Sequence, residues 1–110
     1  MNSEKFLEKL RTALTLELEY FDEEKSPPNM TRDKFLEIIK LANSADMTVR
    51  FDKRETTKGT RSKTGEAEVF HLNFEVYLAF RRRKVPYYCK GYFFDKDKLM
   101  GVFIHSFRES

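Results

Sequence analysis

The segment FHLNFEVYLAFR, from Phe70 to Arg81, decides the fold, because a large apolar residue stands at every second position from Phe70 to Phe80. Alternation over such a length is typical of a β-strand with one buried and one exposed face. The apolar residues are Phe70, Leu72, Phe74, Val76, Leu78 and Phe80. We therefore expect a long strand at about 67–82, with Phe80 in the core.

The residues that follow predict two further strands. The segment 83–86, RKVP, contains a proline and is expected to turn the chain. The segment 95–98, DKDK, is expected to form a second turn, and the apolar and aromatic runs on either side of it predict strands at 87–94 and 99–107.

Four-residue turns at both places would set the strand register. Arg82 would then pair with Tyr87, and Phe94 with Leu99, which leaves one face uniformly apolar. The opposite, free face would hold one cross-strand row of Arg81, Tyr88 and His105. Its remaining aromatic and basic members would be Tyr77, Lys90, Tyr92, Phe94, Phe103 and Phe107.

The first half of the chain predicts two helices and one more strand. Apolar spacing indicates a helix at 3–21, although alternation from Leu14 to Tyr20 leaves a strand open for its second half. Thr31 is the expected N-cap of a helix at 32–43, and alternation at 47–54 predicts a strand. Together these elements indicate a single α+β domain over 1–110, with two N-terminal helices packed on one face of a four-stranded, mainly antiparallel sheet.

Composition points to a nucleic-acid partner. Residues 1–46 carry a net charge of −3 and residues 47–110 a net charge of +6, and the second part holds 12 of the 16 aromatic residues. Cations neutralise phosphates and aromatic rings stack on bases. The loop at 55–66, which contains Arg61 and Lys63, extends this basic surface.

Several protein classes are excluded on composition. A single cysteine, Cys89, forms no disulfide framework, and with two histidines it makes no zinc cluster. No apolar run reaches the roughly 20 residues of a membrane span, and the N-terminus does not have the pattern of a signal peptide. We therefore expect a cytoplasmic protein with no cofactor, no bound metal and no membrane partner.

The free face has the side chains that metal-free RNA cleavage needs. Such a reaction requires a base, an acid and cations that stabilise charge on phosphorus. His105 is the natural acid or base, because the ordinary pKa of histidine lies closest to neutral. Lys90 and Arg81 are candidates for holding phosphate, and Tyr92, Tyr88 and Tyr77 for stacking or proton donation. No acidic cluster is placed to bind two Mg²⁺ ions, which argues against a metal-dependent nuclease.

A family resemblance supports the same interpretation. The run YFFDKDKLMGVFIHSFR, residues 92–108, resembles the closing hairpin of RelE/HigB-type toxins, and segments 38–41, 76–78 and 103–109 are similar to the related MqsR group. The resemblance implies a small α+β mRNA endonuclease, often ribosome-dependent, that an antitoxin protein neutralises. It places Lys90, Tyr92, His105 and Arg108 among the cleavage or RNA-binding residues.

Three functions remain open from the sequence. The first is a toxin-like ribonuclease with His105, Lys90 and Tyr92 as catalytic residues. The second is a non-catalytic nucleic-acid- or ribosome-binding domain that uses the same face. The third is a protein-interaction module, such as an immunity, antitoxin or phage inhibitor protein. The expected RNA-binding residues are Arg81, Arg82, Arg83, Tyr77, Tyr88, Arg61, Lys63 and Arg108.

Overall fold

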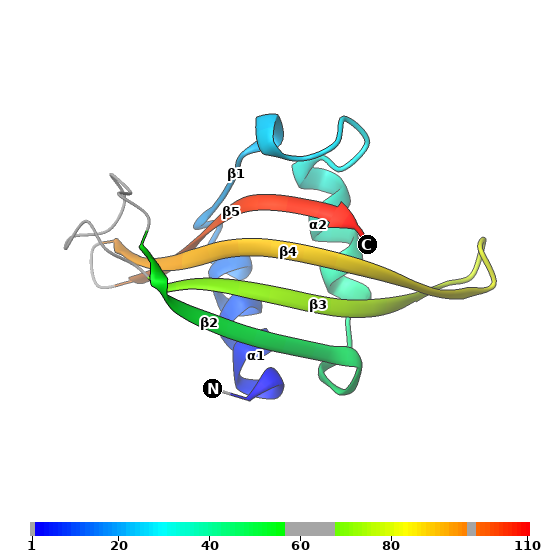
Figure 1. Ribbon diagram of the computed structural model, residues 1–110, viewed down its shortest axis with the longest axis horizontal. Coiled ribbons are helices and arrows are strands. Elements are labelled where there is room, and N and C mark those ends of the chain that lie inside the picture. Colours follow the sequence, from blue (N-terminus) through cyan, green and yellow to red (C-terminus); the bar gives the residue numbers. More distant parts are fainter. Residues whose placement is uncertain (1, 57–67, 97–98) are drawn as a thin grey trace.

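The computed structural model describes residues 2–56, 68–96 and 99–110. Over these ranges it is an α+β fold of two α-helices and a five-stranded mixed sheet with strand order β1-β5-β4-β3-β2. Both α-helices lie behind the sheet in Figure 1, on one of its faces. The elements are α1 (Ser3–Thr15), β1 (Glu19–Phe21), the 3-10 turn η1 (Glu23–Lys25), α2 (Arg32–Leu41), the 3-10 turn η2 (Ser44–Asp46), β2 (Met47–Thr56), β3 (Glu68–Leu78), β4 (Arg83–Lys96) and β5 (Leu99–Glu109).

The first helix is shorter than predicted, because a Schellman motif ends it. Glu17 adopts a left-handed conformation (φ 56°), and the N–H groups of Glu17 and Leu18 donate to the carbonyls of Leu14 and Ala13. The chain then forms β1, which pairs in parallel with β5. The helix predicted to reach residue 21 is therefore wrong, and the strand alternative is correct for residues 19–21. Since β1 separates the helices and makes the sheet mixed, the expectation of consecutive helices on a four-stranded sheet is also corrected.

The second helix confirms its predicted start. Thr31 is the N-cap, and its side chain accepts a hydrogen bond of 3.2 Å from the Lys34 N–H. Met30 and Phe35, on either side of this cap, are both buried. The helix ends at Leu41, two residues before the predicted boundary at 43.

The hairpin between β3 and β4 turns at residues 79–82, not at 83–86 as predicted. The last register pair is Leu78 with Arg83, and Cys89 lies opposite Leu72. Pro86 fits inside β4 because its carbonyl accepts from the Ser110 N–H, beyond the last β4–β5 pair of Tyr87 with Glu109. The missing N–H of the proline therefore faces the end of β5 and costs no ladder hydrogen bond.

This earlier turn corrects the position of Phe80. The predicted register placed its ring in the core opposite Cys89. The ring instead lies in the turn with 76% of the residue's surface exposed.

The pairing of β4 with β5 differs from the prediction at both ends. It continues to Lys96 with Leu99, so Asp95 and Lys96 belong to β4 and not to a turn. Near the other end a β-bulge interrupts the ladder between Lys90 and Gly91. Beyond the bulge Phe107 lies opposite Cys89 and is fully buried, so its predicted place on the free face is wrong.

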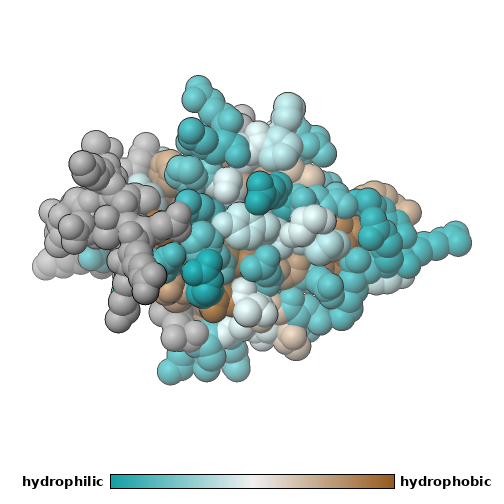
Figure 2. Space-filling model, in the orientation of Figure 1, coloured by the Kyte–Doolittle hydropathy of each residue, from teal (hydrophilic) through white to brown (hydrophobic). Residues whose placement is uncertain are grey.

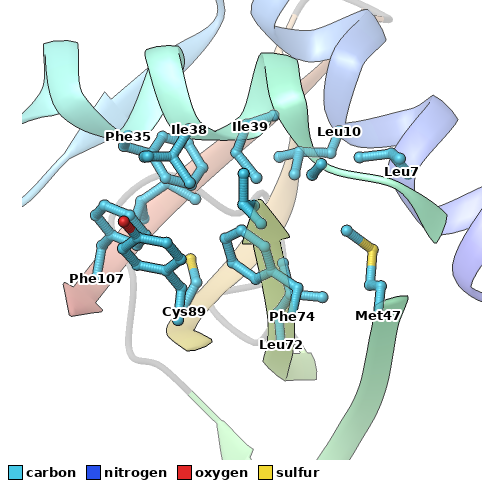
Figure 3. Close-up of a cluster of buried hydrophobic side chains, with 14 of the residues drawn as sticks. Leu7, Leu10, Phe35, Ile38, Ile39, Met47, Leu72, Phe74, Cys89 and Phe107 are labelled. Carbon is cyan, nitrogen blue, oxygen red and sulfur yellow. The ribbon is translucent and has the colours of Figure 1, made fainter. Parts of the chain in front are cut away.

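The core lies between the sheet and the two helices. Figure 3 shows Leu7 and Leu10 of α1 and Phe35, Ile38 and Ile39 of α2 facing side chains of the strands. The strand side chains labelled there are Met47, Leu72, Phe74, Cys89 and Phe107. The ring of Phe107 lies 5.2 Å from that of Phe35 and 5.4 Å from that of Tyr87, measured between centroids. The core therefore lies on the helix side of the sheet, and neither α-helix covers the opposite face.

Candidate functional site: the free face of the sheet

The free face of the sheet, opposite the helices, presents a mixture of basic, polar and aromatic side chains. Figure 2 views the molecule from this side and shows it largely in the colours of hydrophilic and intermediate residues. Two cross-strand rows run over its centre. The first is His71, Lys90 and Ser106, and the second is Asn73, Tyr88 and Arg108.

A hydrogen bond orients His71. Its Nδ1 atom and the phenolic oxygen of Tyr88 are 2.6 Å apart. The guanidinium carbon of Arg108 lies 5.0 Å from the centroid of the Tyr88 ring, a cation–π arrangement. Tyr88 thus connects the imidazole of His71 to a basic side chain on β5. The bond to Tyr88 uses the Nδ1 atom of His71 and not its Nε2 atom.

The β-bulge directs His105 to the same face. Lys90 pairs with Ser106 and Gly91 with Ile104, so His105 is the extra residue between them. The His105 ring lies 6.4 Å from that of Phe103, which in turn stacks on Tyr92 at 5.2 Å. These ring contacts show that His105 and Phe103 share the free face.

Gly91 makes the bulge geometry possible. A Cβ at this position would lie 2.3 Å from the carbonyl oxygen of Phe103 and 2.9 Å from the Phe70 ring. Real side chains do not approach a backbone oxygen so closely. Glycine is therefore required where β4 meets the bulged part of β5.

Two histidines consequently flank Lys90. His71 lies opposite it on β3, and His105 lies beside it on β5. Adjacent strands are about 4.8 Å apart, so the two histidine backbones are separated by roughly 10 Å across β4. Side chains rising from the same face at this separation can contact opposite sides of one phosphodiester. We call these residues the His71–Lys90–His105 row.

Tyr92 is less accessible than its predicted catalytic role assumed. It is 4% exposed, and Phe94 is 5% exposed. The Phe94 ring covers Gly101, and a Cβ at residue 101 would lie 2.5 Å from this ring. The centroid of the Phe94 ring lies 5.6 Å from that of Tyr20. Tyr20, Tyr92, Phe94 and Phe103 thus form a packed aromatic end of the free face.

Arg81 does not lie in the predicted row with Tyr88 and His105. Its guanidinium pairs with Glu109 at 2.9 Å and 3.0 Å, at the turn of the β3–β4 hairpin. Arg82 and Arg83 are exposed in or beside the same turn, and Tyr77 is 59% exposed nearby on the free face. The predicted RNA-binding residues therefore divide between the centre of the sheet, with Tyr88 and Arg108, and the hairpin tip. Arg61 and Lys63 lie outside the described residues.

His71 is the functional candidate that the sequence prediction missed. The alternating pattern already placed it on the polar face of its strand. The misplaced turn, however, shifted the register between β3 and β4 by eight residues and so moved His71 away from Lys90. A register built on a turn at 79–82 would have brought the two together.

Cys89 offers no nucleophile on this face. It lies directly behind Lys90 on the core side, is fully buried, and burial raises the pKa of its thiol. A buried, protonated thiol is unreactive.

Within the described ranges, no cluster of three or more His, Cys, Asp or Glu side chains is arranged to hold a metal ion. The described helices are also too short or too polar to cross a membrane.

No family model, curated protein or solved structure matches this chain. The resemblance to RelE/HigB-type and MqsR toxins therefore stays a prediction.

Proposed function

We propose that this protein is a metal-independent ribonuclease whose active site is the His71–Lys90–His105 row. The observation that supports the proposal is that Lys90 pairs with His71 on β3 and lies beside the bulge residue His105 on β5. Two imidazoles can serve as base and acid in one reaction, and an ammonium group between them can stabilise the charge that develops on phosphorus. Each of the three side chains is half-buried, so a substrate can reach it.

The reaction that fits these groups is an internal transesterification. One imidazole, in its neutral form, removes the proton from the 2′-hydroxyl group, and the 2′-oxygen attacks phosphorus. The bond from phosphorus to the 5′-oxygen breaks, and the other imidazole, in its protonated form, donates a proton to the departing oxygen. The products are a 2′,3′-cyclic phosphate and a free 5′-hydroxyl group. Lys90 contacts the non-bridging phosphate oxygens throughout.

Other residues of the free face have binding roles in this proposal. Arg108 and the Tyr88 ring beneath it offer a cation and an aromatic surface, which suit a neighbouring phosphate and base. Tyr92 supports Phe103 and His105 through ring stacking and contacts no substrate. We extend the proposal, on the resemblance of residues 92–108 alone, to a toxin-like enzyme that acts on cytoplasmic mRNA or on the ribosome and is neutralised by an antitoxin.

Cleavage of a single-stranded RNA oligonucleotide in the presence of EDTA tests the proposal. We expect cyclic-phosphate products from the unaltered protein and a loss of about 10²-fold or more in kcat for His71→Ala and for His105→Ala. Lys90→Ala should also reduce the rate, whereas the matched control Lys40→Ala, an exposed lysine on α2, should not. Full activity in both histidine variants would refute the assignment.

The second candidate is a non-catalytic nucleic-acid-binding domain. The cation–π pair of Arg108 and Tyr88 favours it, because this contact builds a binding surface without needing acid–base chemistry. It predicts salt-sensitive RNA binding, no turnover, and unchanged affinity in His105→Ala.

A further inference from the structure

The β3–β4 hairpin continues beyond the rest of the sheet as a two-stranded arm. The last β2–β3 pair is at Phe74 and the last β4–β5 pair is at Tyr87, so residues 75–86 have no third strand beside them. Figure 1 shows this arm extending past α2. The turn is closed by the N–H groups of Arg81 and Arg82, which donate to the carbonyls of Leu78 and Ala79.

The tip of the arm exposes a large apolar ring. Phe80 is 76% exposed, the largest fraction among the described large apolar side chains. A single exposed apolar residue is unremarkable on a protein surface. Phe80 is different because it stands at the end of a projecting arm and is followed directly by the basic run from Arg81 to Lys84.

Two ion pairs connect this basic run to the body of the protein. Arg81 pairs with Glu109 at 2.9 Å, and Lys84 pairs with Asp46 at 2.9 Å. The hydrogen bond with Asp46 raises the pKa of Lys84. These contacts fix both sides of the arm, which makes the tip a preorganised surface.

The remaining arginines of the tip are available to a ligand. Arg82 forms no ion pair within the described parts of the chain, and Arg83 lies only at the 4.0 Å limit from Glu109. Arg82 also has a left-handed backbone (φ 52°), a conformation that favours glycine and that costs an arginine roughly 1 kcal/mol. A charged side chain at a strained turn position is more easily explained by binding than by folding.

We propose that the hairpin tip is a separate contact for single-stranded RNA, in which Phe80 stacks on an unpaired base and Arg82 and Arg83 bind the flanking phosphates. The identity of the ligand rests on the proposed function. The contact itself is distinct, because Leu78 lies seven residues after His71 on β3, roughly 23 Å along the strand.

The surface between the two sites favours RNA over a lipid bilayer. Tyr77 and Lys84 pair on the free face of the arm, between the tip and the Tyr88–Arg108 pair, with the Glu75–Pro86 pair separating the two rows. A flexible polyanion can follow such a path. A bilayer would need several large apolar side chains at one tip, and Leu78, the nearest large aliphatic side chain on the arm, is buried.

The test measures binding of non-cleavable 2′-O-methyl RNA by fluorescence anisotropy, so that binding is separated from turnover. For a single strand of about 16 nucleotides, we expect Phe80→Ala to weaken the affinity about 10-fold and Phe80→Tyr to retain it. Arg82→Asn, which tolerates the left-handed backbone, should weaken binding and reduce its salt dependence. Cleavage of an RNA dinucleotide, which cannot span the two sites, should be unchanged in Phe80→Ala.

Equal affinity of Phe80→Ala and the unaltered protein for the long strand would overturn the tip contact and leave the proposed function intact. Failure of the proposed function would be seen separately, as absence of dinucleotide cleavage by the unaltered protein. Co-sedimentation with phosphatidylserine–phosphatidylcholine vesicles provides the other arm of the test. Vesicle binding that depends on Phe80, with RNA affinity unchanged in Phe80→Ala, would overturn the proposal in favour of a membrane contact.

Discussion

The guanidinium group of Arg81 lies 2.9 Å and 3.0 Å from the two carboxylate oxygens of Glu109, which joins the turn of the β3–β4 hairpin to the last residue of β5. Both side chains are 32% exposed, so solvent screens the pair only in part. The interaction connects residues that are 28 positions apart in the chain. It therefore controls how firmly the arm is held.

Glu109→Gln should loosen the arm with little effect on the core. We expect a loss of about 1 kcal/mol or less in the free energy of unfolding by urea, and faster hydrogen exchange confined to the amides of residues 79–84. The matched control is Glu37→Gln, an exposed carboxylate of α2, which should change neither quantity. Unchanged exchange at the tip would show that the pair does not restrain the arm.

Tyr88→Phe should impair catalysis while preserving RNA binding. The substitution removes the hydroxyl that bonds His71 Nδ1 but keeps the ring beneath Arg108. We expect kcat to fall about 10-fold because the imidazole loses its fixed orientation. The pH profile of kcat should also change, which a purely structural role would not cause. A profile identical to that of the unaltered protein would exclude Tyr88 as a positioning residue.

Gly91→Ala should destabilise the protein and disturb the bulge. The added methyl group would meet the Phe103 carbonyl oxygen, which belongs to the backbone and cannot rotate away. We expect a loss of about 2–3 kcal/mol in the free energy of unfolding and reduced cleavage through displacement of His105. Ser106→Ala, next to the bulge residue, serves as the control and should leave the free energy of unfolding nearly unchanged.

Phe107→Ala tests the observed register most directly. Phe107 is fully buried against Phe35 and Tyr87, so its truncation should cost about 3–5 kcal/mol. Phe80→Ala, at an exposed position, should lower the free energy of unfolding much less than Phe107→Ala. Equal and small effects at the two positions would contradict the register and restore Phe107 to the free face.

Stability should fall in alkaline solution. Burial raises the pKa of the Cys89 thiol above its ordinary value of 9.0, and burial also raises that of Tyr87 above 10.0. The unfolded chain therefore releases these protons at lower pH than the folded one. The stability they contribute is fully present below about pH 9 and is lost as the pH rises. Urea unfolding from neutral to alkaline pH should show this decline, with a shallower slope in Cys89→Ala.

The sequence predicted much of the fold because hydrophobic patterns determine which face a side chain occupies. The faces of β3 and most of β4 are as predicted, although the turn between them is misplaced by four residues. An even shift leaves every side chain on the same face, so the pattern cannot distinguish turns at 79–82 and 83–86. The prediction placed the turn at 83–86 because this segment contains Pro86. The His71–Lys90–His105 row depends on this register. The sequence pattern alone therefore could not predict that His71 lies opposite Lys90.

Two other features were not decided by the pattern. The alternation from Leu14 to Tyr20 left a strand open, but β1 has only three residues and its start depends on the left-handed Glu17, so the pattern did not separate it from the helix. The bulge adds one residue to β5, which reverses the alternation between Phe103 and Phe107. Because both residues are aromatic, the sequence made them look like members of one face.

The bulge also shows which part of β5 needs residue 105. If the chain lacked it, Ile104 and Ser106 would be consecutive and would face Gly91 and Lys90 in an ordinary antiparallel ladder, with Phe107 still directed to the core. The hydrophobic interior is therefore compatible with a strand one residue shorter. His105 is thus an added residue that the buried side of the strand does not need, and it places an imidazole on the outer face beside the Phe103 ring.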